Sequence, residues 1–153
     1  MKLITPTGSH LLEIMQWFTN EQELTIWSGP NFRYPFDLVS FSEDLKMTEL
    51  NSFVLTNDQL EAMAFGQYYL RLGRCHLGRL VVNPNFRGQG IARQLMDRLF
   101  TLGKKDLGVS EGSLFVLDHN EAAIKSYQSF GFLFTSYPEI IPMESCSYMI
   151  KSI

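Results

Sequence analysis

Apolar residues near the start of the chain recur at the spacing of an α-helix. Residues 2–4 read as a short strand. Thr5 then suits the N-cap of a helix, and Pro6 suits its first position, where a missing amide loses no hydrogen bond. The apolar positions that predict this helix are spaced i, i+4 and i+7, and they are Leu11, Met15 and Phe18.

A loop and a second helix are predicted next. Residues 27–35 are rich in glycine, proline and aromatic side chains, which is typical of an irregular but ordered loop. A short helix is predicted from about residue 37 to 46, because Phe41 and Leu45 are four residues apart.

Three apolar segments in the middle of the chain predict consecutive strands, at residues 52–56, 59–72 and 75–83. Asn57 and Asp58 form a turn signal between the first two strands, and Gly73 and Arg74 form one between the last two. Short turns between neighbouring strands indicate an antiparallel meander.

Helices and strands alternate in the rest of the chain. A long amphipathic helix is predicted over 88–105, followed by a continuous apolar run at 113–117 that is typical of a strand buried on both faces. Another helix is predicted over 120–131, and strands at 132–137 and 146–150 form a closing hairpin. The order βααβββαβαββ predicts a three-layer α+β fold (α/β/α) around a mixed, mostly antiparallel sheet. Its length suits a single domain over 1–153.

Composition and charge narrow the class of protein. The chain is 45% hydrophobic and 19% charged, as folded proteins are, and a net charge of −3 does not suit a nucleic-acid-binding surface. Its start resembles no secretory signal and no segment is apolar enough to span a membrane, so a cytoplasmic location is expected, without membrane or nucleic-acid partners. Cys75 and Cys146 form no CxxC pair, and with three scattered histidines no metal site is expected.

A phosphate-binding loop is predicted where the third middle strand ends. Asn83 ends that strand and Pro84 follows it, and Gly88 and Gly90 open the long helix. The first amides of a helix lack internal partners, carry partial positive charge, and can approach an anion closely where glycine leaves out the Cβ. The P-loop pattern GxxxxGK[ST] is absent, and Arg93 stands where a GxGxxG dinucleotide fingerprint needs its third glycine.

Two motifs in this order resemble the GNAT acyltransferase superfamily, in the form of a small bacterial-type member. Arg87-x-x-Gly90-x-Ala92 resembles its [RQ]xxGx[GA] cofactor motif. The second motif lies about 30 residues further on, and it is Asn120-x-x-Ala123-x-x-x-Tyr127-x-x-x-Gly131-Phe132. Together with the expected strand order, the resemblance spans nearly the whole chain.

The resemblance implies roles for individual residues. The backbone of Leu80, Val81 and Val82 would bind the pantetheine arm of acetyl-CoA, because the family splays this strand from the next. The diphosphate would be bound at the loop that comprises Arg87, Gly88, Gln89, Gly90, Ile91, Ala92 and Arg93. Asn120 would contact the pantetheine end, and Tyr127 would protonate the departing thiolate. The alternatives are a helix cap at Asn120 and a buried core tyrosine at Tyr127.

The general base and the acceptor site are less defined. His76 stands where some relatives carry a glutamate base, and strand alternation would place it on one face with Gly78, Leu80 and Val82; the alternative is a strand histidine without a role. Glu61 is a second candidate base. The acceptor wall is expected in the 27–35 loop, from Trp27, Phe32 and Tyr34, unless these side chains only pack the loop onto the sheet.

The resemblance therefore implies an enzyme, an acetyl-CoA-dependent N-acetyltransferase that transfers acetyl directly to a primary amine of a small molecule or peptide. Two alternatives stay open, a non-catalytic acyl-CoA sensor or scaffold and a protein N-terminal or lysine acetyltransferase. A homodimer is expected from the same resemblance.

Overall fold

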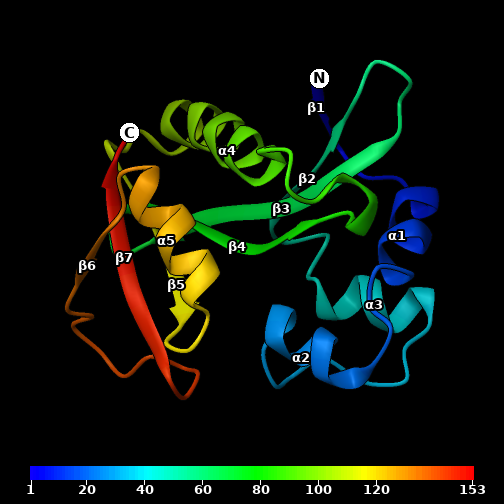
Figure 1. The fold of residues 1–153 in the computed structure, drawn as a ribbon, viewed down its shortest axis with the longest axis horizontal. Coiled ribbons are helices and arrows are strands. Elements are labelled where there is room, and N and C mark those ends of the chain that lie inside the picture. The colour runs from blue at the N-terminus through cyan, green and yellow to red at the C-terminus, as the bar shows by residue number, and fades with distance from the viewer.

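A seven-stranded sheet organises the computed structural model, which describes residues 1–153 (Figure 1). The strand order is β1-β2-β3-β4-β5-β7-β6, and every neighbouring pair is antiparallel except β4 and β5. This confirms the mixed, mostly antiparallel sheet. The strands are β1 Lys2–Ile4, β2 Asn51–Thr56, β3 Ala62–Arg71, β4 Arg74–Val82, β5 Glu111–Leu117, β6 Leu133–Thr135 and β7 Cys146–Ser152.

Five helices cover the two faces of the sheet and complete the predicted three layers (Figure 1). They are α1 Gly8–Met15, α2 Glu21–Ser28, α3 Leu38–Asp44, α4 Ile91–Leu107 and α5 Glu121–Ser129. Leu95 and Leu99 of α4 are fully buried against one face, while Ile14 of α1 and Phe41 of α3 are fully buried against the other. Each such side chain contributes roughly 1.5–3 kcal/mol of transfer free energy to folding. No helix in the structure combines the length and the apolarity that a membrane span requires.

The N-terminal region differs from the prediction in two places. The first helix begins after Thr7, not Thr5, and the backbone amide of Thr7 donates a hydrogen bond to His10 Nδ1 (3.0 Å). The helix α2 was not predicted, and it includes Trp27, which the sequence placed in a loop. Asn20 caps α2 by accepting from the Glu23 amide (2.9 Å), and a polar capping pattern with little apolar periodicity explains why the helix was missed.

The C-terminal strands pair as predicted, but β7 also has a second neighbour. It lies between β6 and β5, so it pairs with β6 in the hairpin and also joins that hairpin to β5. Its register with β5 runs from Glu111 opposite Ser152 to Leu117 opposite Cys146.

Two glycines let α4 lie close to the sheet. A Cβ at Gly103 would stand 2.3 Å from Cys75 Sγ, and a Cβ at Gly112 would stand 2.3 Å from the Phe100 ring. Real Cβ atoms do not approach other heavy atoms this closely, so both contacts require glycine. They hold α4 against β4 and β5.

The parallel strands β4 and β5 separate partway along their length. They pair from Cys75 opposite Gly112 only as far as Leu77 opposite Leu114, although β4 continues to Val82 and β5 to Leu117. The separation leaves the backbone of the last part of β4 without a partner on the β5 side. A β-sheet interior otherwise satisfies such groups, so this gap is a place for a ligand.

A β-bulge in β4 accompanies the separation. The register with β3 shifts between Phe65 and Gln67, and Arg79 adopts a positive φ of 50°. The extra residue reverses the alternation of side chains, so Leu80 and Val82 pack on the α4 side whereas His76 packs on the other. The prediction that these residues share one face with His76 is therefore wrong.

Candidate active site

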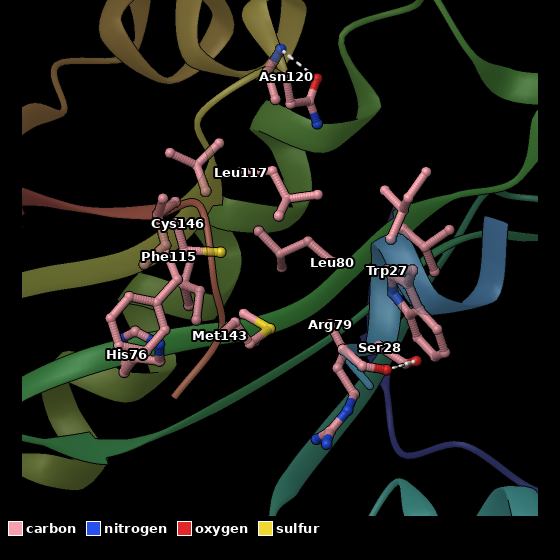
Figure 2. Close-up of a pocket in the computed structure, with 18 of the residues that line it drawn as sticks. Trp27, Ser28, His76, Arg79, Leu80, Phe115, Leu117, Asn120, Met143 and Cys146 are labelled. Carbon is pink, nitrogen blue, oxygen red and sulfur yellow. Dashed lines mark hydrogen bonds between the residues drawn. The ribbon is translucent and has the colours of Figure 1, made fainter. Parts of the chain in front are cut away.

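A cavity of about 960 Å³ extends across the gap between β4 and β5 (Figure 2). Figure 2 shows His76 and Phe115 on one side, Trp27 on the other, and Leu80 between them. Elements from both halves of the chain build its wall, namely the ends of β4 and β5, the helices α2 and α5, and the segment that precedes β7. All three residues expected at the pantetheine arm, Leu80, Val81 and Val82, line it.

The predicted phosphate loop lies at the start of α4. Gly88 and Gly90 adopt φ of +75° and +74°, which glycine reaches without steric cost, and a Cβ at either position would meet nothing within 4 Å. None of the backbone amides from residue 88 to 93 donates one of the turn, loop or cap hydrogen bonds of the chain. The first turn of α4 holds no acidic side chain. Open amides at a positive helix end suit the diphosphate of coenzyme A.

Arg87 connects this loop to the cavity. Its exposed side chain lines the cavity together with Glu23 of α2. The hydrogen bond from the Thr19 backbone lowers the pKa of the Glu23 carboxyl, and the Arg87 charge lowers it slightly further. The two side chains thus place opposite charges in the cavity wall.

Tyr127 is held by α5 with its side chain in the cavity wall. Its ring makes an edge contact with Phe132 (5.8 Å between centroids), and its hydroxyl has no hydrogen-bond partner within the chain. Burial raises the pKa of Tyr127, so the hydroxyl carries its proton at neutral pH. It is therefore available as a proton donor at this position.

Asn120 also lines the cavity, at the start of α5. Its side-chain oxygen accepts a hydrogen bond from the Ala123 amide (3.3 Å), as an N-cap does. The side-chain NH₂ group makes no hydrogen bond within the chain, so capping leaves the donor half of the amide free for a ligand.

His76 lines the cavity but is only 2% exposed. Its Nδ1 lies 2.9 Å from Ser113 Oγ, and its ring packs against Tyr69 and Phe115. Burial, and secondarily the charge of Arg71, lower the pKa of His76 to about 3. A proton acceptor works best when its pKa is near the working pH, so this environment favours a packing role over the predicted role of base.

Glu61, the second candidate base, lies outside the cavity. It is exposed in the turn before β3, where Asn57 Nδ2 donates to its Oε1 (3.3 Å).

Only one of the three predicted acceptor-site aromatics lines the cavity. Trp27 does so, stacked on Phe18 with 4.6 Å between ring centroids, and its Nε1 is buried without a hydrogen-bond partner. Phe32 packs edge-on against Trp27 (5.7 Å), and the exposed Tyr34 packs against Phe36 (5.9 Å). The cavity therefore includes Trp27 and excludes the other two.

Sequence reasoning missed several cavity residues. Tyr69 and Arg71 line it from β3, and Arg79 lines it from the bulge in β4. Alternation along the predicted 59–72 strand could have placed Tyr69 and Arg71 on one face. Arg79 could not be found in this way, because the bulge that directs it has no sequence signal. Cys146 lines it from the first position of β7, and Met143 enters from the segment before that strand, whose path depends on distant packing.

Comparison with known proteins agrees with this geometry. The model of the Acetyltransferase (GNAT) family matches residues 11–132 of the chain. Both sequence motifs lie within the matched region.

Solved structures of similar fold cover almost the whole chain. The ribosomal-protein-S18-alanine N-acetyltransferase from Escherichia coli is 23% identical with a TM-score of 0.67, over 99% of this chain and 93% of that one. The spermidine N-acetyltransferase from Vibrio cholerae, solved with CoA and spermine, is 18% identical with a TM-score of 0.74, over 99% and 94%. The PaiA N-acetyltransferase from Thermoplasma acidophilum, solved with coenzyme A, is 14% identical with a TM-score of 0.70, over 99% and 98%. With a family match over most of its length and the fold of these enzymes, the chain belongs to the GNAT family of acetyltransferases.

Proposed function

We propose that this protein is an acetyl-CoA-dependent N-acetyltransferase that transfers acetyl directly to a primary amine of a small molecule or peptide. The observation that carries the proposal is the end of β4–β5 pairing after Leu77, which opens a cavity beside free strand backbone. The phosphate loop at the start of α4 continues directly from that strand through a short 3₁₀ helix at Pro84–Phe86.

The residues fit coenzyme A at both of its recognition points. The amides from Gly88 to Arg93 would bind the diphosphate, and the backbone of Leu80 to Val82 would bind the pantetheine amides. When bound, the thioester supplies the acetyl group. A strand of three residues spans about 10 Å, so the two regions are separate and bind successive parts of an extended ligand.

Tyr127 is proposed as the proton donor to the leaving thiolate. Its hydroxyl is protonated at neutral pH and has no competing partner. A thiol has an ordinary pKa near 8.5, so the thiolate leaves with modest assistance, and loss of Tyr127 slows transfer without abolishing it. Asn120 would hold the cofactor near this hydroxyl through its free NH₂ group.

The alternative functions make different use of the same cavity. A non-catalytic sensor would bind acyl-CoA without turnover, and the free Tyr127 hydroxyl favours the enzyme over it. A protein N-terminus or a lysine as acceptor would enter through the open side of the cavity. Both cysteines are free thiols in the structure, which fits the reducing cytoplasm as the proposed location.

The test is coenzyme A release from acetyl-CoA, measured with a thiol dye, across polyamines, amino acids, aminoglycosides and short peptides. Wild type is compared with Gly90→Trp, and Gly108→Trp is the matched control because Gly108 is also left-handed and open, at the other end of the same helix. Acceptor-dependent release that Gly90→Trp abolishes and Gly108→Trp retains would support the enzyme. Acetyl-CoA binding without release would favour the sensor, and no binding would refute the phosphate loop.

A further inference from the structure

Two arginines that line the cavity make no salt bridge, and Asp44, whose charge acts on Arg79, pairs with Arg33 instead. Arg71 and Arg79 both line the cavity, and neither makes a salt bridge, whereas Arg33 and Arg74 each pair with an acidic side chain. A half-buried charge without a partner costs desolvation energy that an unrelated surface arginine avoids. An anionic ligand would offset that cost.

The surroundings of Arg79 hold its guanidinium in place and leave part of it free. Its Nη1 donates to Gln67 Oε1 (3.0 Å), and the guanidinium lies 5.5 Å from the Phe32 ring centroid. Gln67 is itself fixed, because its Nε2 donates to the Leu45 carbonyl (2.7 Å) and to Ser52 Oγ (2.9 Å). The Nε of Arg79 is buried and has no partner.

Arg79 lies at a strained position of the backbone. A non-glycine residue at φ of 50° is uncommon, and here it forms the bulge next to the separated part of β4. A residue under such strain beside a cavity suggests that its side chain has a function there.

Arg71 approaches the same region from β3. Its guanidinium lies 5.6 Å from the Tyr69 ring centroid and 5.1 Å from that of Phe115, and its Nη1 donates to the Tyr137 hydroxyl (3.4 Å). Burial raises the pKa of the Tyr69 hydroxyl, and the charges of both Arg71 and Arg79 oppose that rise. That hydroxyl has no partner within the chain.

The balance of charge in the cavity opposes that of the whole chain. The charged side chains that line it are four basic and two acidic, although the net charge of the chain is −3, and they are Lys46, Arg71, Arg79, Arg87, Glu23 and Glu49. Arg87 belongs to the phosphate loop, and the 80–82 segment separates Arg79 from that loop by about 10 Å. Arg71 and Arg79 are therefore available to the acceptor instead of the diphosphate.

We propose that the acceptor is an amine that also carries a carboxylate, an amino acid or an acidic peptide, and that Arg79, assisted by Arg71, binds this carboxylate. The inference rests on the proposed function, because it describes the second substrate of the same site. A planar guanidinium binds a carboxylate through two parallel hydrogen bonds, and amino acids and peptides place this anion near the reacting amine. A carboxylate-free polyamine would instead meet an excess of positive charge.

The test is calorimetric titration of acceptors into the protein saturated with coenzyme A, which reads binding without turnover. One arm compares free amino acids with their carboxamides, and a second compares peptide amides that contain glutamate with the same peptides containing glutamine. Spermidine is the carboxylate-free reference. In at least one of the two arms, we expect the ligands that carry the carboxylate to bind at least about tenfold more tightly than their neutral counterparts.

The variants assign the effect to the arginines. Arg79→Met should remove most of the preference for the carboxylate, Arg79→Lys should retain part of it, and Arg71→Met should reduce it. Arg98→Met is the matched control, because Arg98 lies outside the cavity and hydrogen-bonds only to Gln94 on α4. An unchanged coenzyme A affinity shows that each variant is folded.

Two results would overturn the proposal, namely equal or tighter binding of spermidine or the carboxamides, and loss of affinity in Arg79→Met that is the same for both members of a pair. If no amine releases coenzyme A from acetyl-CoA, the proposed enzyme fails. The carboxylate preference is still decided by the titration, so the two failures are distinguishable.

Discussion

Acidification should destabilise this protein through one buried side chain. His76 is 2% exposed, and burial lowers its pKa from about 6.5 in the unfolded chain to about 3 in the folded protein. Between these values the unfolded state binds more protons, so the free energy of unfolding decreases as the pH falls. From pH 7 to pH 4.5, proton uptake by the unfolded chain at this single site costs about 2.5 kcal/mol.

The measurement is urea unfolding followed by tryptophan fluorescence at several values between pH 7 and pH 4.5. His76→Gln removes the titrating group, keeps a hydrogen-bonding side chain near Ser113, and should show a correspondingly smaller loss of stability. Carboxyl groups with a lowered pKa, such as those of Asp37 and Asp44, also reduce the free energy of unfolding as the pH falls. Their contribution is the same in wild type and His76→Gln, so it cancels from the difference between the two proteins. His119→Gln, at an exposed position, is the control and should follow the wild type.

Equal losses in wild type and His76→Gln would refute this reasoning. They would show that His76 takes up its proton in the folded state, and that its ring is more accessible to water than the structure has it. In that case His76 would again be a candidate for the general base.

Three further predictions concern other positions. Gly112→Ala should destabilise the protein by about 1–3 kcal/mol in denaturant titrations, because the new Cβ clashes with Phe100, whereas Gly8→Ala at an open helix position should not. Tyr127→Phe should lower kcat at least about tenfold in the thiol-release assay while the KM for acetyl-CoA stays constant, and a kcat that does not change would remove its role. Asn120→Asp should keep the α5 cap and weaken coenzyme A binding, whereas Asn120→Ala should also cost about 1 kcal/mol of stability; equal affinity in both variants and wild type would limit Asn120 to capping.

The parts predicted correctly are those that local sequence controls. The loop at Gly88 and Gly90 and the helix that follows it depend on neighbouring residues and on backbone freedom, so their position could be read directly, while phosphate binding there stays a prediction. The same holds for the helix cap at Asn120 and for the position of Tyr127 on the helix that Asn120 caps.

The parts that were missed depend on contacts between distant segments. His76 is buried by Ser113 and Phe115, which lie about 40 residues away in the sequence, so its pKa could not be anticipated from its own strand. The bulge at Arg79 reverses a simple alternation by one residue and leaves no mark in composition. Phe32 was assigned to the acceptor site from its place in the 27–35 segment, but it packs under Trp27 instead.

The close contact of Gly103 with Cys75 sets the distance between α4 and the sheet near the C-terminal end of the helix. Thirteen residues, or about 20 Å of helix, separate this contact from the loop at Gly90. A methyl group at position 103 would tilt α4 about its middle and shift the far end relative to β4. A residue that touches no ligand would then change the affinity for the diphosphate. The distance between helix and sheet at one end of α4 thus determines the position of the binding loop at the other end.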